Sequence, residues 1–444
     1  MNAKTTTKTS TGSETGRATG QTAGQTAGQT TGHTTDQGFS GDRRLLLSSA
    51  AAAAAGALLV PGLANAQATP GVTASEIRIG TTTSLSGPVS ALGTINRAQA
   101  AYFKMLNEQG GIAGRKINYI ILDDGFAPPK TLEQTRRLVE QDEVAFLFSQ
   151  LGTGPNSAIV KYLNGLNIPH LFLSVNGDKW GDYKSYPWTI PFAPSARIES
   201  QIFVKYALQQ NPKSKFAILY QNDDLGRDFL TGAKEVLGAQ FDSMATALSY
   251  EVTDPTVDSQ LITLKATGAD VLISGVTGKF GAMAIRRVSE IGWKVMHMVP
   301  SGVASVTSTI VPAGVERSIG VISSVYTKDP SDPSWAEDPA IKTYKAFMAK
   351  HYPEGNPNES YNAYGYMVAQ VMQRVLEQCN GNFTRANIMA QVNNLKNLEN
   401  QMLLPGIKVN TSPTNHHPLT QMQLMRWDGK LWQRFGNIIS GSNI

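Results

Sequence analysis

The stretch at residues 75–124 constrains the fold of this chain most, because it contains a complete strand–loop–helix–strand unit. Apolar and polar residues alternate in the first predicted strand, at residues 76–83. A loop of small residues with a Gly-Pro pair follows at residues 84–93, and the helix after it has one apolar face and ends at Gly110-Gly111. Residues 117–122 are the second predicted strand. This order predicts a right-handed βαβ crossover in a parallel sheet.

Loops at the carboxyl ends of parallel strands face a ligand crevice, so residues 84–93 are the first candidate part of a binding site. A second candidate is the small polar loop at residues 149–156, which follows an apolar run expected to form a buried strand. This loop lacks the Gly-Lys-Ser/Thr sequence of a phosphate-binding loop. Thr153 and the start of the next helix instead suit a carboxylate, because unpaired N–H groups attract anions. A simple helix cap is the alternative role for Thr153.

A proline-rich segment at residues 186–194 has no helical period and predicts an extended crossing between two lobes. A second series of alternating elements follows it, which is typical of a parallel doubly wound domain. Its predicted strands lie at residues 216–220, 245–251, 271–274 and 295–300. Beyond them the sequence predicts a strand at residues 319–325, helices at 339–351 and 360–378, and a hairpin of residues 421–426 and 431–435. The Asp428-Gly429 pair favours a type I′ turn in this hairpin.

The first 66 residues predict a targeting segment rather than a folded domain. Residues 1–40 are rich in Thr, Gly and Gln and have almost nothing to bury, so we expect them to be disordered. Arg43-Arg44 and the short Ala/Leu run at residues 45–60 resemble a twin-arginine export signal. The run is shorter than the ~20 residues that span a membrane. Cleavage after Ala66 would release the protein into the periplasm.

Composition excludes several functional classes. The formal net charge of +5 over 444 residues provides no basic surface for nucleic acid. Cys379 is the only cysteine, so the chain forms no internal disulfide, and we expect this thiol to be buried and inert. His416-His417 is the only adjacent histidine pair, and its Pro/Thr/Asn-rich surroundings predict a solvated loop rather than a metal site. No cofactor is expected.

Catalysis requires a nucleophile, a histidine and an acid that converge, and the predicted crevice loops contain no histidine. The carboxylate pairs Asp123-Asp124 and Asp223-Asp224 follow predicted strands, where helix capping explains them as well as acid/base chemistry does. We therefore expect the protein not to be an enzyme, with a hydrolase as the less favoured alternative.

Two motifs in the opening unit carry a family resemblance: LSGPVSALG at residues 85–93 and NEQGGIAGRKI at residues 107–117, followed by Asp123-Asp124. Together they resemble the type I periplasmic binding proteins, specifically the branched-chain amino-acid (leucine/isoleucine/valine) binding family of ABC importers. The resemblance implies two doubly wound α/β lobes joined by a three-segment hinge. It places residues 67–192 and 302–414 in the first lobe, and residues 193–301 and 415–444 in the second.

The resemblance also implies a function. The chain would be the extracytoplasmic solute-binding component of an ABC importer, which captures a small carboxylate-bearing ligand, such as an amino acid or aromatic acid, and delivers it to a membrane permease. The expected partners are this ligand and the permease, with no nucleic acid, and the protein is expected to be a monomer. An extracytoplasmic sensor that presents its ligand to a signalling partner is the alternative.

Members of the family that bind amino acids hold the α-carboxylate with loops after the third and fourth strands, and the resemblance places Gly152, Thr153, Ser174, Val175 and Asn176 there. Leu92 matches a position that packs over the ligand side chain. In the second lobe, Leu225 replaces an aromatic residue, and the acid that binds the ligand ammonium is expected near Asp254. The remaining crevice positions implied by the resemblance are Gly275, Ser301 and Tyr326.

Overall fold

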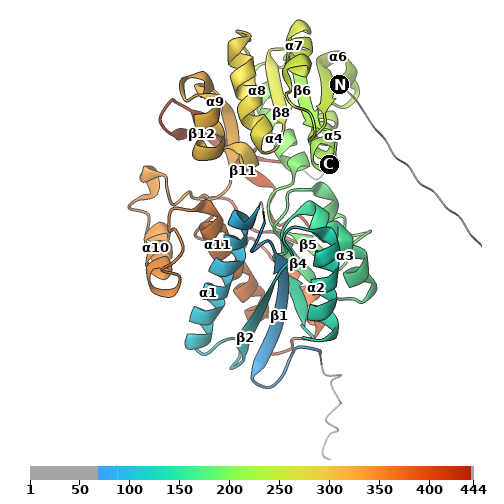
Figure 1. Cartoon of the computed structure of the whole chain (residues 1–444), viewed down its shortest axis with the longest axis vertical. Helices are drawn as coiled ribbons and strands as arrows, with labels where there is room; N and C mark the ends of the chain where they lie inside the picture. Colours follow the sequence, from blue (N-terminus) through green and yellow to red (C-terminus); the bar gives the residue numbers. More distant parts are fainter. Residues whose placement is uncertain (1–68, 88, 442–444) are drawn as a thin grey trace, which may run out of the picture. The chain divides into compact units, whose positions relative to one another are not determined.

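The computed structural model describes residues 69–87 and 89–441, which fold around two β-sheets (Figure 1). The predicted low-complexity leader and export signal lie outside the described residues. Within the described part, no helix combines the length and apolar character needed to cross a membrane.

The first lobe is built on a five-stranded sheet with the strand order β2-β1-β3-β4-β5, and all of its pairings are parallel. The β1–α1–β2 unit confirms the predicted βαβ crossover. The strands are β1 (Glu76–Thr83), β2 (Lys116–Asp123), β3 (Phe146–Phe148), β4 (His170–Leu173) and β5 (Thr189–Pro191).

Helices cover both faces of this sheet, because its strands are apolar on both sides. On one face, Phe146 and Phe148 of β3 pack in a core with α1, α10, α11 and α12. On the other, Leu147 packs against α2 and α3. Gly365 lets α11 approach α1 closely, since a side chain there would overlap the Ile95 carbonyl. The helices are α1 (Thr94–Glu108), α2 (Pro128–Glu140), α3 (Thr153–Gly165), α10 (Pro339–His351), α11 (Ser360–Gln378) and α12 (Arg385–Val392).

The second lobe is built on a seven-stranded sheet with the order β12-β11-β10-β9-β8-β6-β7. Strands β6 to β10 are parallel, whereas β11 and β12 form an antiparallel hairpin at one edge. The strands are β6 (Phe216–Gln221), β7 (Ala245–Tyr250), β8 (Val271–Gly275), β9 (Met296–Met298), β10 (Ile322–Val325), β11 (Gln421–Trp427) and β12 (Trp432–Ser440).

This sheet is also covered on both faces. Alternate residues of β6 point to opposite sides: Phe216 and Ile218 pack with α4 and α5, whereas Ala217 and Leu219 pack with α7 and α8. The helices are α4 (Ala196–Gln210), α5 (Asp224–Leu237), α6 (Phe241–Met244), α7 (Asp258–Ala266), α8 (Lys279–Glu290) and α9 (Val311–Ala313). Two doubly wound α/β lobes are thus confirmed.

Two sequence predictions about the second lobe are wrong. The chain was expected to return to the first lobe after Gly302, but β10 lies between β9 and β11 in the seven-stranded sheet. A short apolar run fits either sheet equally well, and only its pairing decides. The predicted hairpin forms, but Trp427 pairs with Trp432, so a four-residue loop replaces the two-residue type I′ turn.

Three segments cross between the lobes and form the hinge. The first runs from β5 to α4, the second follows β10, and the third precedes β11. The second crossing is held by the chain that leads into the third: the Leu404 N–H donates to the Tyr326 carbonyl at 3.0 Å, and the Lys328 N–H donates to the Met402 carbonyl at 2.8 Å.

Candidate functional site

Four residues, 149–152, separate the carboxyl end of β3 from the start of the helix α3. Gly152 is its N-cap residue, and no side chain caps the helix. The alternative role of Thr153 as a helix cap is therefore wrong. Thr153, the first residue of α3, is half-buried and places a hydroxyl beside the first N–H groups of the helix. Such an end is suited to a carboxylate, because the helix dipole and the unpaired donors act together.

Gly152 is required by both backbone and packing. Its φ of 86° lies in the left-handed region, and a side chain at this position would overlap the ring of Phe126. Phe126 belongs to the loop that follows β2 and is itself half-buried. The structure therefore places an aromatic ring next to the residue that opens α3.

The residues after β4 include a hydroxyl, an apolar side chain and an amide. The Ser174 hydroxyl lies 2.9 Å from the Ser149 hydroxyl, and Leu151 forms a β-bridge with Ser174. Val175 is buried beside Trp180, whereas Asn176 is exposed and donates a hydrogen bond of 3.2 Å to the Pro194 carbonyl. Asn176 thus supports the first crossing between the lobes.

Two tyrosines extend this polar region towards the second lobe. The Tyr364 hydroxyl, from α11, is buried close to the Ser174 side chain. Tyr326 lies on the second crossing. Burial raises the pKa of Tyr326 well above its ordinary value, and the neighbouring Tyr364 and Glu199 raise it further.

Glu199 is the acidic group of this region, and only 5 % of its surface is exposed. It lies in the first turn of α4 and accepts hydrogen bonds from the Ser324 hydroxyl of β10 and, at 2.7 Å, from the Ser301 backbone N–H. Burial raises the pKa of Glu199, while the two serines lower it. Ser174, Tyr364, Tyr326, Glu199 and Ser301, called the seam cluster here, thus connect the first lobe, the hinge and the second lobe.

In the described part of the chain, no hydrogen bond or ion pair joins the side chains of the other predicted site residues to the seam cluster. Leu92 is half-buried in the short 3-10 helix Ser90–Gly93, and Leu225 packs against the second-lobe core from the start of α5. Gly275 ends β8, where a Cβ would lie 2.9 Å from the Phe229 ring. The Asp254 carboxylate accepts a hydrogen bond of 2.9 Å from the Glu251 N–H within its own turn.

Charged side chains link the two lobes beside α3. Lys179, after β4, lies 2.8 Å from the Asp224 carboxylate of α5 and donates a hydrogen bond of 3.0 Å to the Ser157 hydroxyl of α3. Arg197 of α4 pairs with Asp178 at 3.1 Å and with Glu235 of α5 at 2.7 Å. Burial raises the pKa of Asp228 in α5 to about 7, and the nearby carboxylates of Asp178 and Asp224 raise it as well.

The carboxylate pairs weighed for catalysis have structural partners. Asp123 accepts hydrogen bonds from the Leu85 N–H at 2.9 Å and the Ser86 hydroxyl at 2.6 Å, and these bonds hold the loop after β1. Asp124 accepts a hydrogen bond of 2.9 Å from the Thr131 hydroxyl of α2. Asp223 is the N-cap of α5 and accepts the Gly226 N–H at 3.0 Å.

The histidine pair is not solvated, contrary to the sequence prediction. His416 is 1 % exposed, and its Nδ1 lies 2.9 Å from the Thr189 carbonyl, while His417 Nε2 lies 3.4 Å from the Asp178 carboxylate. Both rings contact the segment of residues 178–189, so a buried contact replaces the expected loop surface. Burial lowers the pKa of both residues. No cluster of three or more His, Cys, Asp or Glu side chains suited to a metal occurs among residues 69–87 and 89–441.

Sequence reasoning missed Phe126, Glu199 and Tyr364. Phe126 follows the carboxyl end of β2, and that position is the signal that could have identified it. Glu199 and Tyr364 lie within helices, where a single polar residue in an amphipathic pattern looks like part of the solvated face. Only the packing of the helices shows that both are turned inward.

Comparisons with known proteins agree with this architecture. The family model described as "Periplasmic binding protein" matches residues 76–431. The Leu/Ile/Val-binding protein homolog 7 of Brucella abortus is 23 % identical over 385 residues, covering 84 % of this chain and 95 % of that protein.

Two solved structures share the fold. A branched-chain amino acid ABC transporter protein from Thermus thermophilus with bound valine has a TM-score of 0.69 at 15 % identity, covering 82 % of this chain and 97 % of that one. A fatty acid ABC transporter substrate-binding protein from Thermomonospora curvata has a TM-score of 0.64 at 20 % identity, covering 83 % and 94 %. The chain belongs to the periplasmic binding protein family, as a type I member with a solute-binding role.

Proposed function

We propose that this protein is the extracytoplasmic solute-binding component of an ABC importer and captures a small carboxylate-bearing ligand between its two lobes. The observation that carries the proposal is the seam cluster, in which the buried Glu199 and half-buried polar groups of both lobes and the hinge lie together. A ligand that bridges these groups is bound by both lobes at once, and its binding energy therefore favours their closure.

We assign the carboxylate of the ligand to the N-terminus of α3. Gly152 leaves the helix uncapped, and Thr153 adds a hydroxyl donor beside the first N–H groups. A carboxylate there accepts charge-assisted hydrogen bonds, which are stronger than those between neutral groups. Ser174 and Val175 lie on the neighbouring loop, which the Leu151–Ser174 bridge joins to the start of α3.

The opposite end of the ligand is assigned to Glu199. A buried carboxylate gains most from a partner that donates hydrogen bonds or carries positive charge, since burial alone disfavours its ionised form. Glu199 therefore suits the ammonium of an amino acid better than Asp254 does, because Glu199 is buried within the seam cluster, whereas Asp254 is only half-buried and closes its own turn. Phe126 and Leu225 supply apolar surface for the remainder of the ligand.

The named ligands of two relatives support the carboxylate. One relative binds valine and another is named for fatty acids, and these two ligands share a carboxylate while only valine carries an amine. The Brucella relative is named for leucine, isoleucine and valine. Amino acids, aromatic acids and related carboxylates are therefore the first compounds to test.

Thermal unfolding of the purified protein with a ligand panel tests this function. A ligand at ~100 times its dissociation constant adds ~2.7 kcal/mol to the free energy of unfolding and visibly raises Tm. We expect at least one amino acid, aromatic acid or short-chain carboxylate to raise Tm, and nucleotides and metal ions to leave it unchanged. Stabilisation by a nucleotide or metal ion alone would contradict the proposal.

Delivery to a permease needs a separate test, because a sensor would bind the same ligand. Deleting the gene should abolish uptake of the radiolabelled ligand into cells, and the Thr153→Ala variant should restore uptake only at raised ligand concentration. Normal uptake in the deletion strain would favour the sensor. Conversion of the ligand to a product by the purified protein would show an enzyme instead.

A further inference from the structure

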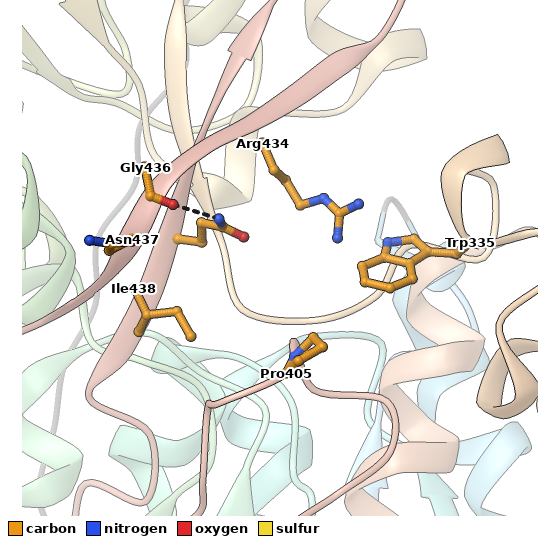
Figure 2. A pocket seen from close by; sticks show the side chains of 7 residues that line it. Trp335, Pro405, Arg434, Gly436, Asn437 and Ile438 are labelled. Atoms are coloured by element: carbon orange, nitrogen blue, oxygen red, sulfur yellow. Dashed lines mark hydrogen bonds between the residues drawn. The ribbon is translucent and has the colours of Figure 1, made fainter.

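A cavity of about 510 Å³ lies beside the hinge and shares no lining residue with the seam cluster (Figure 2). Small-molecule sites typically occupy ~300–1,000 Å³. Trp335 follows the second crossing and Pro405 precedes the third, while the β11–β12 hairpin supplies the other wall. The hairpin residues that line it are Gln423, Arg434, Gly436, Asn437 and Ile438.

An irregularity in the hairpin shapes this wall. Met422 pairs with Ile439 but Leu424 pairs with Phe435, so three residues of β12 face Gln423 alone. The Gln423 amide nitrogen donates a hydrogen bond of 2.8 Å to the Gly436 carbonyl, which fixes the side chain within the bulge. Gly436 has a φ of 65°, which a residue with a side chain rarely adopts. Bulges of this kind re-aim side chains and are frequent beside functional sites.

Arg434 brings an uncompensated positive charge to the cavity. Its guanidinium carbon lies 3.9 Å from the centre of the Trp335 ring, and it donates a hydrogen bond of 2.9 Å to the Ser334 hydroxyl. Lys328 also lies over this ring, at 5.1 Å, but is neutralised by Asp338 at 2.7 Å. In the part of the chain that the structure describes, no carboxylate lies within 4.0 Å of the Arg434 guanidinium.

Ile438 and Pro405 offer apolar surface beside the polar side chains of Gln423 and Asn437. Ile438 packs against the first-lobe core, and Gly406 lies so close to it that a Cβ there would be 3.1 Å from the Ile438 side chain. Figure 2 shows Arg434 and Trp335 on one side of the cavity and Ile438 on the other, with Pro405 below them in this view. The cavity therefore presents a positive charge at Arg434 and apolar surface at Ile438 and Pro405.

We propose that this hinge cavity is a second ligand site, which binds a small organic anion with an apolar body. The carboxylate pairs with the guanidinium of Arg434, which the indole and Ser334 already hold in place, so little side-chain entropy is lost on binding. The apolar body lies against Ile438 and Pro405. The site is independent of the cleft ligand and of the importer role.

Titration with benzoate, followed by NMR of the indole N–H signals, tests the site. The chain has six tryptophans, and Trp335→Phe identifies the signal of Trp335. Benzoate should shift this signal saturably, and acetate, which lacks the apolar body, should bind at least tenfold more weakly. If inorganic phosphate bound as tightly as benzoate, the result would contradict the apolar surface assigned to the site. A benzoate response confined to other signals would show binding elsewhere and overturn the proposal.

Arg434→Gln should weaken benzoate binding at least tenfold. Arg426→Gln is the matched control, because Arg426 lies on the same hairpin but stacks on Phe435 at 4.6 Å, outside the cavity lining. It should leave the dissociation constant within twofold. Equal losses in both variants would indicate general charge attraction and overturn the proposal, as would unchanged binding in Arg434→Gln.

A second variant keeps the test decisive where Arg434→Gln fails to fold. Asn437 is exposed and lines the cavity, so Asn437→Asp adds a negative charge with little effect on packing. It should weaken benzoate binding at least fivefold, and Asn437→Ser should not. Equal affinities in the two variants would contradict the assigned position of the anion.

Discussion

The Asp178 backbone N–H donates a hydrogen bond of 2.7 Å to the Asp228 carboxylate and so ties the loop after β4 to α5 of the other lobe. Asp228 is half-buried, and carboxylates of Asp178 and Asp224 lie nearby, which together raise its pKa to about 7. Lys179, Arg197 and Glu235 complete the charged surroundings. The contact between the lobes therefore contains a carboxyl group that titrates near neutral pH.

This raised pKa predicts a pH dependence of stability. A carboxyl group with a folded pKa of about 7 and an unfolded pKa near 3.8 holds its proton longer in the folded state. The stabilisation that the protonated group gives to the folded state is fully present below pH ~4. As the pH rises towards ~7, the free energy of unfolding falls by up to about 4 kcal/mol. Asp228→Asn should remove this loss, so the stability difference between variant and wild type should grow from pH 5 to pH 8. Denaturant unfolding at both pH values measures it, and a constant difference would refute the assignment.

Replacing Thr153 should weaken ligand binding and spare folding. Thr153→Ala removes the hydroxyl assigned to the carboxylate, at a cost of ~1.5–3 kcal/mol, or roughly ten- to a hundredfold in affinity. Thr153→Ser, which keeps the hydroxyl, is the control. Because no side chain caps α3, Tm should change little in either variant. Calorimetric titration with the ligand found by the thermal screen checks this, and unaltered affinity would remove Thr153 from the site.

Replacing Glu199 should separate ligands by charge. The amide of Glu199→Gln still accepts hydrogen bonds from Ser301 and Ser324 but carries no charge. An amine-bearing ligand should lose at least tenfold in affinity, ~1.5 kcal/mol or more, because a charged hydrogen bond becomes a neutral one. A carboxylate without an amine should bind as before. Titration of an amino acid and its deaminated analogue compares the two, and parallel losses would contradict a role in amine recognition.

The export prediction rests on the sequence alone. If export uses the twin-arginine route, the precursor should accumulate in the cytoplasm when Arg43 and Arg44 are replaced with lysines, since that route recognises the pair of guanidinium groups. Cell fractionation followed by immunoblotting measures this. Unchanged export would indicate the general secretory route and leave the periplasmic location intact.

The sequence predicts helices and strands better than it predicts how the strands pair. Helices α10 and α11 begin and end where periodicity placed them, because their apolar faces and caps are local features. The lobe that contains β10 depends on the pairing of Ile322 with Met298 of β9 and Arg426 of β11, and no local pattern encodes this pairing. The buried His416 illustrates the same limit, since its partner Thr189 lies 227 residues away.

The candidate site divides in the same way. Gly152 and Thr153 could be predicted because glycine and hydroxyl residues at the end of a buried strand form a local signal. Glu199 could not, since it is buried against Ser301 and Ser324, which belong to a short 3-10 helix and a strand more than 100 residues further along the chain.

The strand order has a consequence for how the protein is made. Strands β6 to β10 are synthesised before α10, α11 and α12, which complete the first lobe, and β11 and β12 come later still to complete the second. A ribosome that has reached residue 330 has therefore produced neither lobe in full. A chain truncated there would leave apolar faces uncovered in both, and neither lobe can be expressed as one uninterrupted piece of the natural sequence. Obtaining a single lobe requires joining separated segments with a designed linker.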